Sequence, residues 1–323
     1  MNVAVKPDEG AAPLADINPA RIDRFRNDTI WPMFERLRRE DPIHFTETSE
    51  YGPYWSITRW DDVMAVDTNH GDFSSAEGIA LTNQADRVEQ EAILAQMGQE
   101  PRRNNAGFIT MDEPEHSVHR KAVTPTVAPA NLANMAPIVR ERAGQILDSL
   151  PIAKPFDWVD LVSKELTAMT LATLFDFPFE DRRKLTYWSD MIMNQPGHGP
   201  VKSYQHKAEA MFECFGTFQQ LWNERMGGKP GNDLISMLTQ NPETRTMSVE
   251  DYQGTVILLI VGGNDTTRNT ISGSVYALNK FPAEYDKLRA NPGLVASMVS
   301  ETIRWQTPLT HMSRVATLCQ ACT

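Results

Sequence analysis

The stretch from Ser248 to Phe281 limits what this chain can fold into more than any other part of the sequence. It opens on Ser248-Val249-Glu250-Asp251, a capping-box pattern in which the serine oxygen and an acid three residues later satisfy free backbone N–H groups at a helix start. It ends before Pro282, which cannot continue a helix. No residue in between forces a break, so the stretch predicts one helix on the order of 50 Å long. Because residues 256–261 are apolar on every side, this helix is expected to lie inside the protein.

Residues 262–267 of the same helix, Gly-Gly-Asn-Asp-Thr-Thr, interrupt the apolar pattern. Each glycine costs about 0.5–1 kcal/mol in a helix relative to alanine, and a buried unpaired carboxylate at Asp265 would cost more. Several local violations at one place usually mark a functional site. Gly262 and Gly263 would let a large flat group approach the backbone, and Thr266 could bond the carbonyl one turn earlier and loosen the helix. The alternative is a close crossing of two helices whose polar residues face solvent.

Composition argues against several classes of function. The 323 residues carry 31 basic and 42 acidic side chains, a formal charge of −11, which argues against binding nucleic acid or an anionic membrane surface. No apolar run is long enough for a membrane span, and the N-terminus lacks a signal-peptide core. The three cysteines, Cys214, Cys319 and Cys322, imply no disulfide framework. We therefore predict a cytoplasmic protein.

Helical periodicity dominates the chain, so the predicted fold class is mainly α with a small β portion (α+β). Residues 1–17 are predicted to be a flexible tail. Two short strands at residues 43–46 and 54–58 should form a hairpin near the N-terminus. Residues 69–110 are polar and poorly periodic, which predicts a long irregular segment. Besides the central helix, we predict helices at residues 31–40, 60–66, 114–123, 131–149, 158–175, 180–193, 203–226, 232–239, 283–290 and 294–305.

Outside the central helix, pairs of histidine, arginine and cysteine residues are candidate sites. His116 and Arg120 are four residues apart, so a helix places both donors on one face, where they would suit a carboxylate or phosphate group. The alternative is a solvated basic helix face. His116 and His119 could ligate a metal, but no third ligand of matching spacing is visible, and we predict no metal site. Cys319-x-x-Cys322 has neither the further ligands of a zinc site nor the surroundings of a redox motif.

Three motifs follow one another along the chain: His116-x-x-x-Arg120, Gly262-Gly263-Asn264-Asp265-Thr266-Thr267 and Glu301-x-x-Arg304. Each is weak alone, but in this order they resemble the cytochrome P450 family of heme-thiolate monooxygenases. The resemblance covers the chain from about Trp31 to Ala316. The central motif and the Arg-Asn-Thr that follows it are similar to a bacterial branch that hydroxylates terminal carbons of alkanes and fatty acids. The implied fold is a cytochrome P450 fold around the long central helix.

The resemblance implies roles for the residues of the central helix. Gly262 and Gly263 would lie over one face of the heme, which is the implied cofactor. Asp265 and Thr266 match the acid–alcohol pair that relays protons to dioxygen. The irregular region 69–110 would cover the substrate, and apolar residues there and around Leu258–Val261 would set the preferred length of the substrate chain.

Other residues are assigned by the same resemblance. His116, Arg120 and Arg314 match the donors that hold the heme propionates by charge-assisted hydrogen bonds. Glu301 and Arg304 match a buried structural ion pair. The implied partners are an apolar small-molecule substrate, dioxygen, and a ferredoxin with its ferredoxin reductase.

The family's heme-ligating cysteine is expected in a glycine-rich loop downstream of Glu-x-x-Arg, and this sequence ends at Thr323 before such a loop. Cys319 and Cys322 lie too close to Arg314 to serve, so no residue is predicted as a metal ligand. We therefore expect residues 18–323 to be an incomplete cytochrome P450 domain that forms no thiolate-ligated heme and lacks monooxygenase activity by itself.

The complete enzyme would insert one atom of dioxygen into an unactivated C–H bond, with electrons from the ferredoxin. The alternative function, from a different class, is a non-enzymatic helical protein that holds an apolar small molecule at residues 262–267.

Overall fold

The computed structural model describes residues 12–100, 106–228 and 231–317. They belong to two compact units: an N-terminal unit of residues 12–100 with 313–317, and a helical unit of residues 106–312. Among the described residues, the model contains no helix that combines the length and the apolar character needed to cross a bilayer.

The N-terminal unit holds the small β portion. Strands β1 and β2 form the predicted hairpin, with Ile43 opposite Ile57 and Thr46 opposite Tyr54. A second two-stranded antiparallel sheet joins β3 to β4 from the far end of the sequence. The elements of this unit are a 3-10 helix Leu14–Asp16, α1 Ile22–Arg26, α2 Trp31–Glu40, β1 Ile43–Thr46, β2 Tyr54–Ile57, α3 Trp60–Asp67, β3 Phe73–Ser74, α4 Gln84–Gln96 and β4 Val315–Ala316.

The first helical segment of this unit begins before residue 17, the predicted end of the flexible tail. The 3-10 helix at Leu14–Asp16 precedes Ile17, which is buried in a small core with Ile30, Met33 and Leu37. Burying such side chains contributes about 1.5–3 kcal/mol each, which is enough to hold this segment against α2.

The prediction of an irregular segment over residues 69–110 is wrong for α4 (Gln84–Gln96). The Asn83 side chain caps this helix by accepting from the backbone N–H groups of Ala85 and Asp86, at 2.9 and 3.3 Å. No residue of α4 is buried, so the sequence carries no apolar stripe to reveal it. The signals that could have predicted this helix are its Asn83 cap and its strong helix formers, Gln, Glu and Ala.

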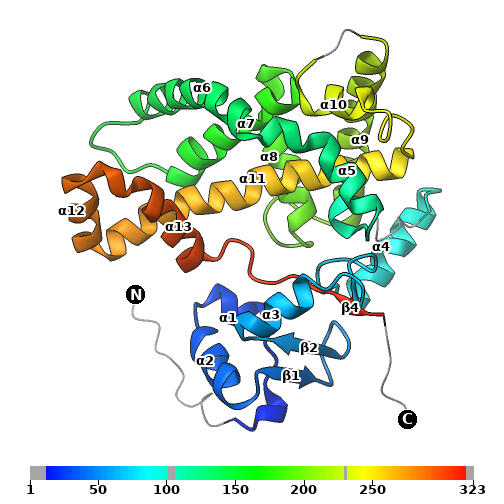
Figure 1. Ribbon diagram of the computed structural model, residues 1–323, viewed down its shortest axis with the longest axis vertical. Coiled ribbons are helices and arrows are strands. Elements are labelled where there is room, and N and C mark those ends of the chain that lie inside the picture. Colours follow the sequence, from blue (N-terminus) through cyan, green and yellow to red (C-terminus); the bar gives the residue numbers. More distant parts are fainter. Residues whose placement is uncertain (1–11, 101–105, 229–230, 318–323) are drawn as a thin grey trace. The chain divides into compact units, whose positions relative to one another are not determined.

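The helical unit is built around α11. Figure 1 shows this helix, coloured from yellow to orange, running through the unit with α12 and α13 at its carboxyl end. The α-helices of this unit are α5 Glu115–Val123, α6 Pro129–Asp148, α7 Glu165–Phe175, α8 Arg183–Met193, α9 Tyr204–Met226, α10 Leu234–Gln240, α11 Val249–Lys280, α12 Pro282–Ala290 and α13 Val295–Gln306. Four 3-10 turns connect them, at Phe108–Thr110, Thr124–Val127, Phe179–Asp181 and Pro292–Leu294. The predicted helix 158–175 is confirmed as one continuous helical stretch, but its first part, Val159–Lys164, is a π-helical turn, and α7 follows it.

The 32 residues of α11 confirm the single long helix. The Ser248 hydroxyl accepts from the Asp251 backbone N–H at 3.1 Å, as the capping pattern predicted. On the core side Val256 and Ile260 are fully buried, and the core continues through aromatic residues of α7, α8 and α9. The expectation of burial on every side is wrong, because Leu258 and Val261 are only half-buried. The core of the unit lies along one side of α11.

A short segment before α5 lies directly on the backbone of α11. A side chain at Gly254 would run into the carbonyl oxygen of Ala106 and come within 2.6 Å of the Gly107 nitrogen. A side chain at Gly107 would in turn lie 2.8 Å from the Gly254 oxygen. Two glycines thus let two backbones approach more closely than any other residue pair allows.

Candidate functional site

The predicted site residues of α11 other than Gly263 share one stripe of the helix with two apolar residues. Leu258, Val261, Gly262, Asp265 and Thr266 recur at the three- and four-residue spacing that places side chains on one face. We call this stripe the open face, because each of its members is half-buried or exposed. A Cβ atom built at Gly262 would meet no heavy atom within 4 Å. The open face therefore combines apolar side chains, a vacant position and two polar groups.

The neighbouring glycine has a different environment. A Cβ atom at Gly263 would lie 2.7 Å from Cδ2 of Leu171 on α7, a side chain that is 2% exposed. The close helix crossing considered as the alternative therefore explains Gly263. It does not explain Gly262, which has no such contact.

The Thr266 hydroxyl donates to the Gly262 carbonyl oxygen at 2.8 Å, one turn earlier, as predicted. The expected loosening of the helix does not follow, since α11 stays α-helical from Val249 to Lys280. A hydroxyl in this arrangement still has lone pairs with which it can accept from water.

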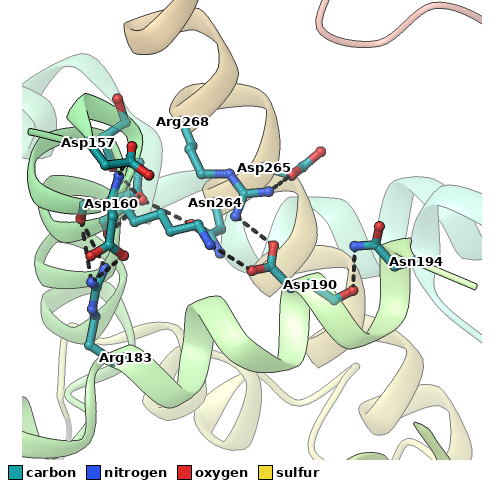
Figure 2. A network of polar contacts seen from close by, with 11 residues as sticks. Asp157, Asp160, Arg183, Asp190, Asn194, Asn264, Asp265 and Arg268 are labelled. Atoms are coloured by element: carbon teal, nitrogen blue, oxygen red, sulfur yellow. Dashed lines mark hydrogen bonds and ion pairs between the residues drawn. The ribbon is translucent and has the colours of Figure 1, made fainter. Parts of the chain in front are cut away.

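Asp265 is not the unpaired carboxylate that the sequence suggested. Its Oδ1 accepts from Nη2 of Arg268, and its Oδ2 accepts a long bond from Nδ2 of Asn269 at 3.4 Å. Figure 2 shows the Arg268 guanidinium between Asp265 and Asp190 of α8, to which it donates at 2.7 Å through Nη1. Arg268 was not among the predicted site residues, although its spacing of three residues from Asp265 on one helix was a usable signal.

The ion network extends to the π-helical turn. Nζ of Lys164 lies 3.0 Å from the second carboxylate oxygen of Asp190. The side chains of Arg268, Asp190 and Asp265 are 10–15% exposed, and Lys164 reaches 28%. Two cations and two carboxylates therefore form a largely buried group of zero net charge. Charges buried in this way require such pairing.

Hydrogen bonds between polar side chains continue on both sides of this ion network. Oγ1 of Thr167 donates to Oδ1 of the fully buried Asn264 at 2.9 Å, and the Ser272 and Ser163 hydroxyls lie 2.9 Å apart. Nδ2 of Asn264 is buried without a hydrogen-bond partner in the structure. Helix α11 is thus held to α7 and the π-helical turn by side-chain hydrogen bonds as well as by apolar packing.

His116 and Arg120 lie one turn apart on α5. Nδ1 of His116 is 3.2 Å from Oε1 of Glu113, while Arg120 is exposed and forms no ion pair with any residue in the described ranges. A hydrogen bond from the Ser117 hydroxyl, at 2.6 Å, and the contact with His116 hold the pKa of the Glu113 carboxyl below its usual value. Nε2 of His116 and the Arg120 guanidinium are among the groups on α5 that can bind an anion.

Arg314 belongs to the N-terminal unit. Its Nη2 donates to Asp67 of α3 at 2.7 Å, and its side chain is 16% exposed. The structure places His116 and Arg120 on one helix, and their joint binding of one group with Arg314 stays a prediction.

The Glu301–Arg304 pair forms on α13, with contacts of 2.6 and 2.7 Å. The prediction that this pair is buried is wrong, because the two side chains are 60% and 70% exposed. Helix α13 buries Thr302, and residues 301 and 304 point away from that face. An exposed pair of this kind contributes little to stability.

The cofactor implied by the resemblance can be tested against the residues present. The vacant position at Gly262 and the donors on α5 fit one face and the propionates of a heme. Among the described residues the axial thiolate is not matched: Cys214 on α9 is fully buried in the core, and Cys319 and Cys322 lie outside the described residues. Residues 12–100, 106–228 and 231–317 contain no cluster of three or more His, Cys, Asp or Glu that could hold a metal ion.

Two hollows of the helical unit lie away from the open face. One, of about 420 Å³, is lined by residues of α6, α7 and α8 with the preceding loops, including Arg182 and Arg183. The other, of about 360 Å³, lies among α11, α12 and α13, beside Phe281 and Trp305. Neither is lined by Asp265 or Thr266, so the assignment of the site rests on the open face of α11.

Comparisons with known proteins agree with the fold and the motifs. The family model described as Cytochrome P450 matches residues 30–295. Linalool 8-monooxygenase of Pseudomonas putida is 31% identical over 288 residues, covering 88% of this chain and 69% of that protein. A methyl-branched lipid omega-hydroxylase of Mycobacterium tuberculosis is 26% identical over 318 residues, covering 94% and 71%.

Solved structures give the same result. CYP153D17 from Sphingomonas sp. PAMC 26605 is 41% identical, with a TM-score of 0.78 over 92% of this chain and 71% of that one. Cytochrome P450-153 from Novosphingobium aromaticivorans is 36% identical, with a TM-score of 0.80 over 93% and 72%.

Proposed function

The chain belongs to the cytochrome P450 family of heme-thiolate monooxygenases, and we propose that its reaction is hydroxylation of a terminal carbon of an alkane or fatty acid. When bound, heme supplies the activation of dioxygen from which one atom enters a C–H bond. The residues of this chain provide the surface that orients the substrate and the groups that deliver protons.

The open face of α11 is the observation that carries the proposal. Leu258 and Val261 present apolar side chains about one to two turns before Asp265 and Thr266, with the vacant Gly262 between them. An unactivated hydrocarbon offers no polar group, so it must be held by apolar contacts of this kind. The vacant position at Gly262 gives a flat cofactor access to the helix.

Asp265 and Thr266 have the chemistry for proton delivery. The Thr266 hydroxyl is anchored by its bond to Gly262 and can hold a water molecule through its lone pairs. The Asp265 carboxylate, adjacent on the same face, can take a proton from solvent and pass it to that water. His116 and Arg120, together with Arg314, would bind the carboxylates of the cofactor.

The name of a relative supports the substrate class, and the resemblance supports the electron donor. The Mycobacterium relative is named for oxidation of an omega carbon, and its substrate class is a lipid. The motif at residues 262–267 resembles the branch that hydroxylates terminal carbons. A ferredoxin and its reductase are the proposed electron donors, as that resemblance implies.

A chimera provides the test. Residues 1–317 are joined to the part of the Novosphingobium protein that follows its matched region, which supplies the axial thiolate loop. The chimera, loaded with heme and given ferredoxin, reductase and NADH, is incubated with alkanes and fatty acids of graded length. Mass spectrometry of the products should find the hydroxyl group on the terminal carbon.

Two substitutions separate the proposed roles from alternatives. In Thr266→Ala we expect product formation to fall about 100-fold while reductant is still consumed. Thr267→Ala, at the adjacent exposed position, is the matched control and should keep the product yield. Equal yields in the two variants would contradict the role of Thr266. Tight binding of hydrocarbon without any product would favour a binding protein.

A further inference from the structure

The ion network of Figure 2 contains an arginine for which the proposed reaction has no role yet. Arg268 is 9% exposed and emerges from α11 three residues after Asp265. Its guanidinium has two ends, of which Nη2 donates to Asp265 and Nη1 to Asp190. Because both contacts are made by one planar group, the position of one carboxylate fixes the position of the other.

The anchor at Asp190 is itself fixed. Its second carboxylate oxygen lies 3.0 Å from Nζ of Lys164, while the first accepts from Arg268. The Asp190 carboxylate is therefore shared between two cations from two different elements. The backbone carbonyl of the same residue accepts from Nδ2 of Asn194 at 2.8 Å, at the end of α8. Arg268 is thus held from α8 and the π-helical turn, not only from its own helix.

Asp265 has few other contacts that could orient it. Asn269 donates at 3.4 Å, a long bond, and the Asp265 side chain is 15% exposed on the open face. The charged groups around it are Arg268 on its own helix, Asp190 on α8 and Lys164 on the π-helical turn. The orientation of the carboxylate therefore depends on Arg268.

We propose that Arg268 is the positioning residue of Asp265: anchored by Asp190, it holds one carboxylate oxygen and leaves the other directed to the open face. The importance of this for turnover rests on the proposed function, in which Asp265 delivers protons. The positioning itself is a property of this chain and can be measured without cofactor.

The first measurement is the side-chain conformation of Asp265 at neutral pH by NMR, in the chain labelled at aspartate and assigned by loss of its signal in Asp265→Asn. The three-bond couplings about χ1 should report one rotamer in the parent. In Arg268→Gln and in Asp190→Asn they should average over several rotamers, because the first change removes the fork that holds the carboxylate and the second removes the anchor of that fork.

The matched control is Arg182→Gln. Arg182 is also largely buried, 23% exposed, and pairs with Glu165 at 2.7 Å, but it has no contact with the network around Asp265. Its loss should leave the Asp265 couplings unchanged. If Asp265 keeps a single rotamer in Arg268→Gln, or if Arg182→Gln averages its couplings equally, the proposal is overturned.

The second measurement separates this proposal from the proposed function. In the heme-loaded chimera, Arg268→Lys keeps the charge but cannot bridge both carboxylates with one fork, so we expect less product per reductant consumed than in the parent. Averaged Asp265 couplings together with unaltered product yield would keep the positioning role and remove the catalytic role of Asp265. A single Asp265 rotamer in the variants removes the positioning role whatever the yield.

Discussion

At the scale of single residues, Gly262 and Gly263 show that two adjacent positions can be glycine for unrelated reasons. Gly263 lacks a side chain because Leu171 occupies that space, whereas the space beside Gly262 is vacant. The sequence assigned both to the cofactor because a glycine leaves no trace of which neighbour excludes its side chain. For Asp265 and Arg268 the sequence is more informative, since their spacing on one helix indicates that they can pair. Only their partner Asp190 on α8 could not be predicted from the sequence.

We predict opposite effects for alanine at the two positions. Gly262→Ala should raise the free energy of unfolding by about 0.5–1 kcal/mol, since alanine favours a helix and meets no atom there. Gly263→Ala should lower it by about 1–2 kcal/mol, because the new methyl group overpacks against the buried Leu171. Urea unfolding of both variants checks this. Two changes of the same sign would contradict the assignment of the two environments.

At the scale of elements, the signals that could be read were local ones. The bounds of α11 were predicted to within a residue because a serine cap and a proline act on their immediate neighbours. Helix α4 was missed because it buries nothing, and the π-helical turn before α7 was missed because its extra residue per turn depends on packing. The segment at Ala106 and Gly107 lies on α11 through a contact between residues almost 150 positions apart, which no local pattern encodes.

That contact gives a prediction for Gly254→Ala. The methyl group would meet the backbone of Ala106 and Gly107, which cannot turn aside as a side chain can. We expect a loss of about 3 kcal/mol or more in the free energy of unfolding. Gly216→Ala in α9, which would meet nothing within 4 Å, is the control and should be stabilising by about 0.5–1 kcal/mol. Thermal unfolding followed by circular dichroism distinguishes the two. Similar melting temperatures would mean that the segment does not lie on α11.

At the scale of the whole molecule, stability at alkaline pH should report on one buried tyrosine. Tyr252 is 2% exposed, its hydroxyl donates to the Phe218 carbonyl at 2.8 Å, and burial raises its pKa well above the ordinary value of 10.0. The folded protein therefore keeps a proton that the unfolded chain releases above that pH. The contribution of this group is complete below pH 10 and decreases as the pH rises.

Tyr252→Phe should accordingly flatten the alkaline part of the stability curve. Between about pH 10 and 11, the free energy of unfolding of the parent should fall by up to about 1.4 kcal/mol per pH unit more than that of the variant. The lost hydrogen bond lowers the whole curve of the variant, so the slope and not the height is compared. Tyr285→Phe, at a residue that is 45% exposed, is the control. Parallel slopes for the parent and Tyr252→Phe would contradict the prediction.

The open face of α11 has a consequence for how such a protein can change over evolutionary time. Leu258 and Val261 lie half-buried outside the core cluster, on the same helix whose opposite side holds Val256 and Ile260 fully buried. Mutations at Leu258 and Val261 can alter which molecules are accepted with little loss of folding stability. Mutations at Val256 and Ile260 destabilise the core and are therefore selected against. One helix thus keeps adaptable and constrained positions apart, and a laboratory selection for new substrates should collect its substitutions at residues 258 and 261.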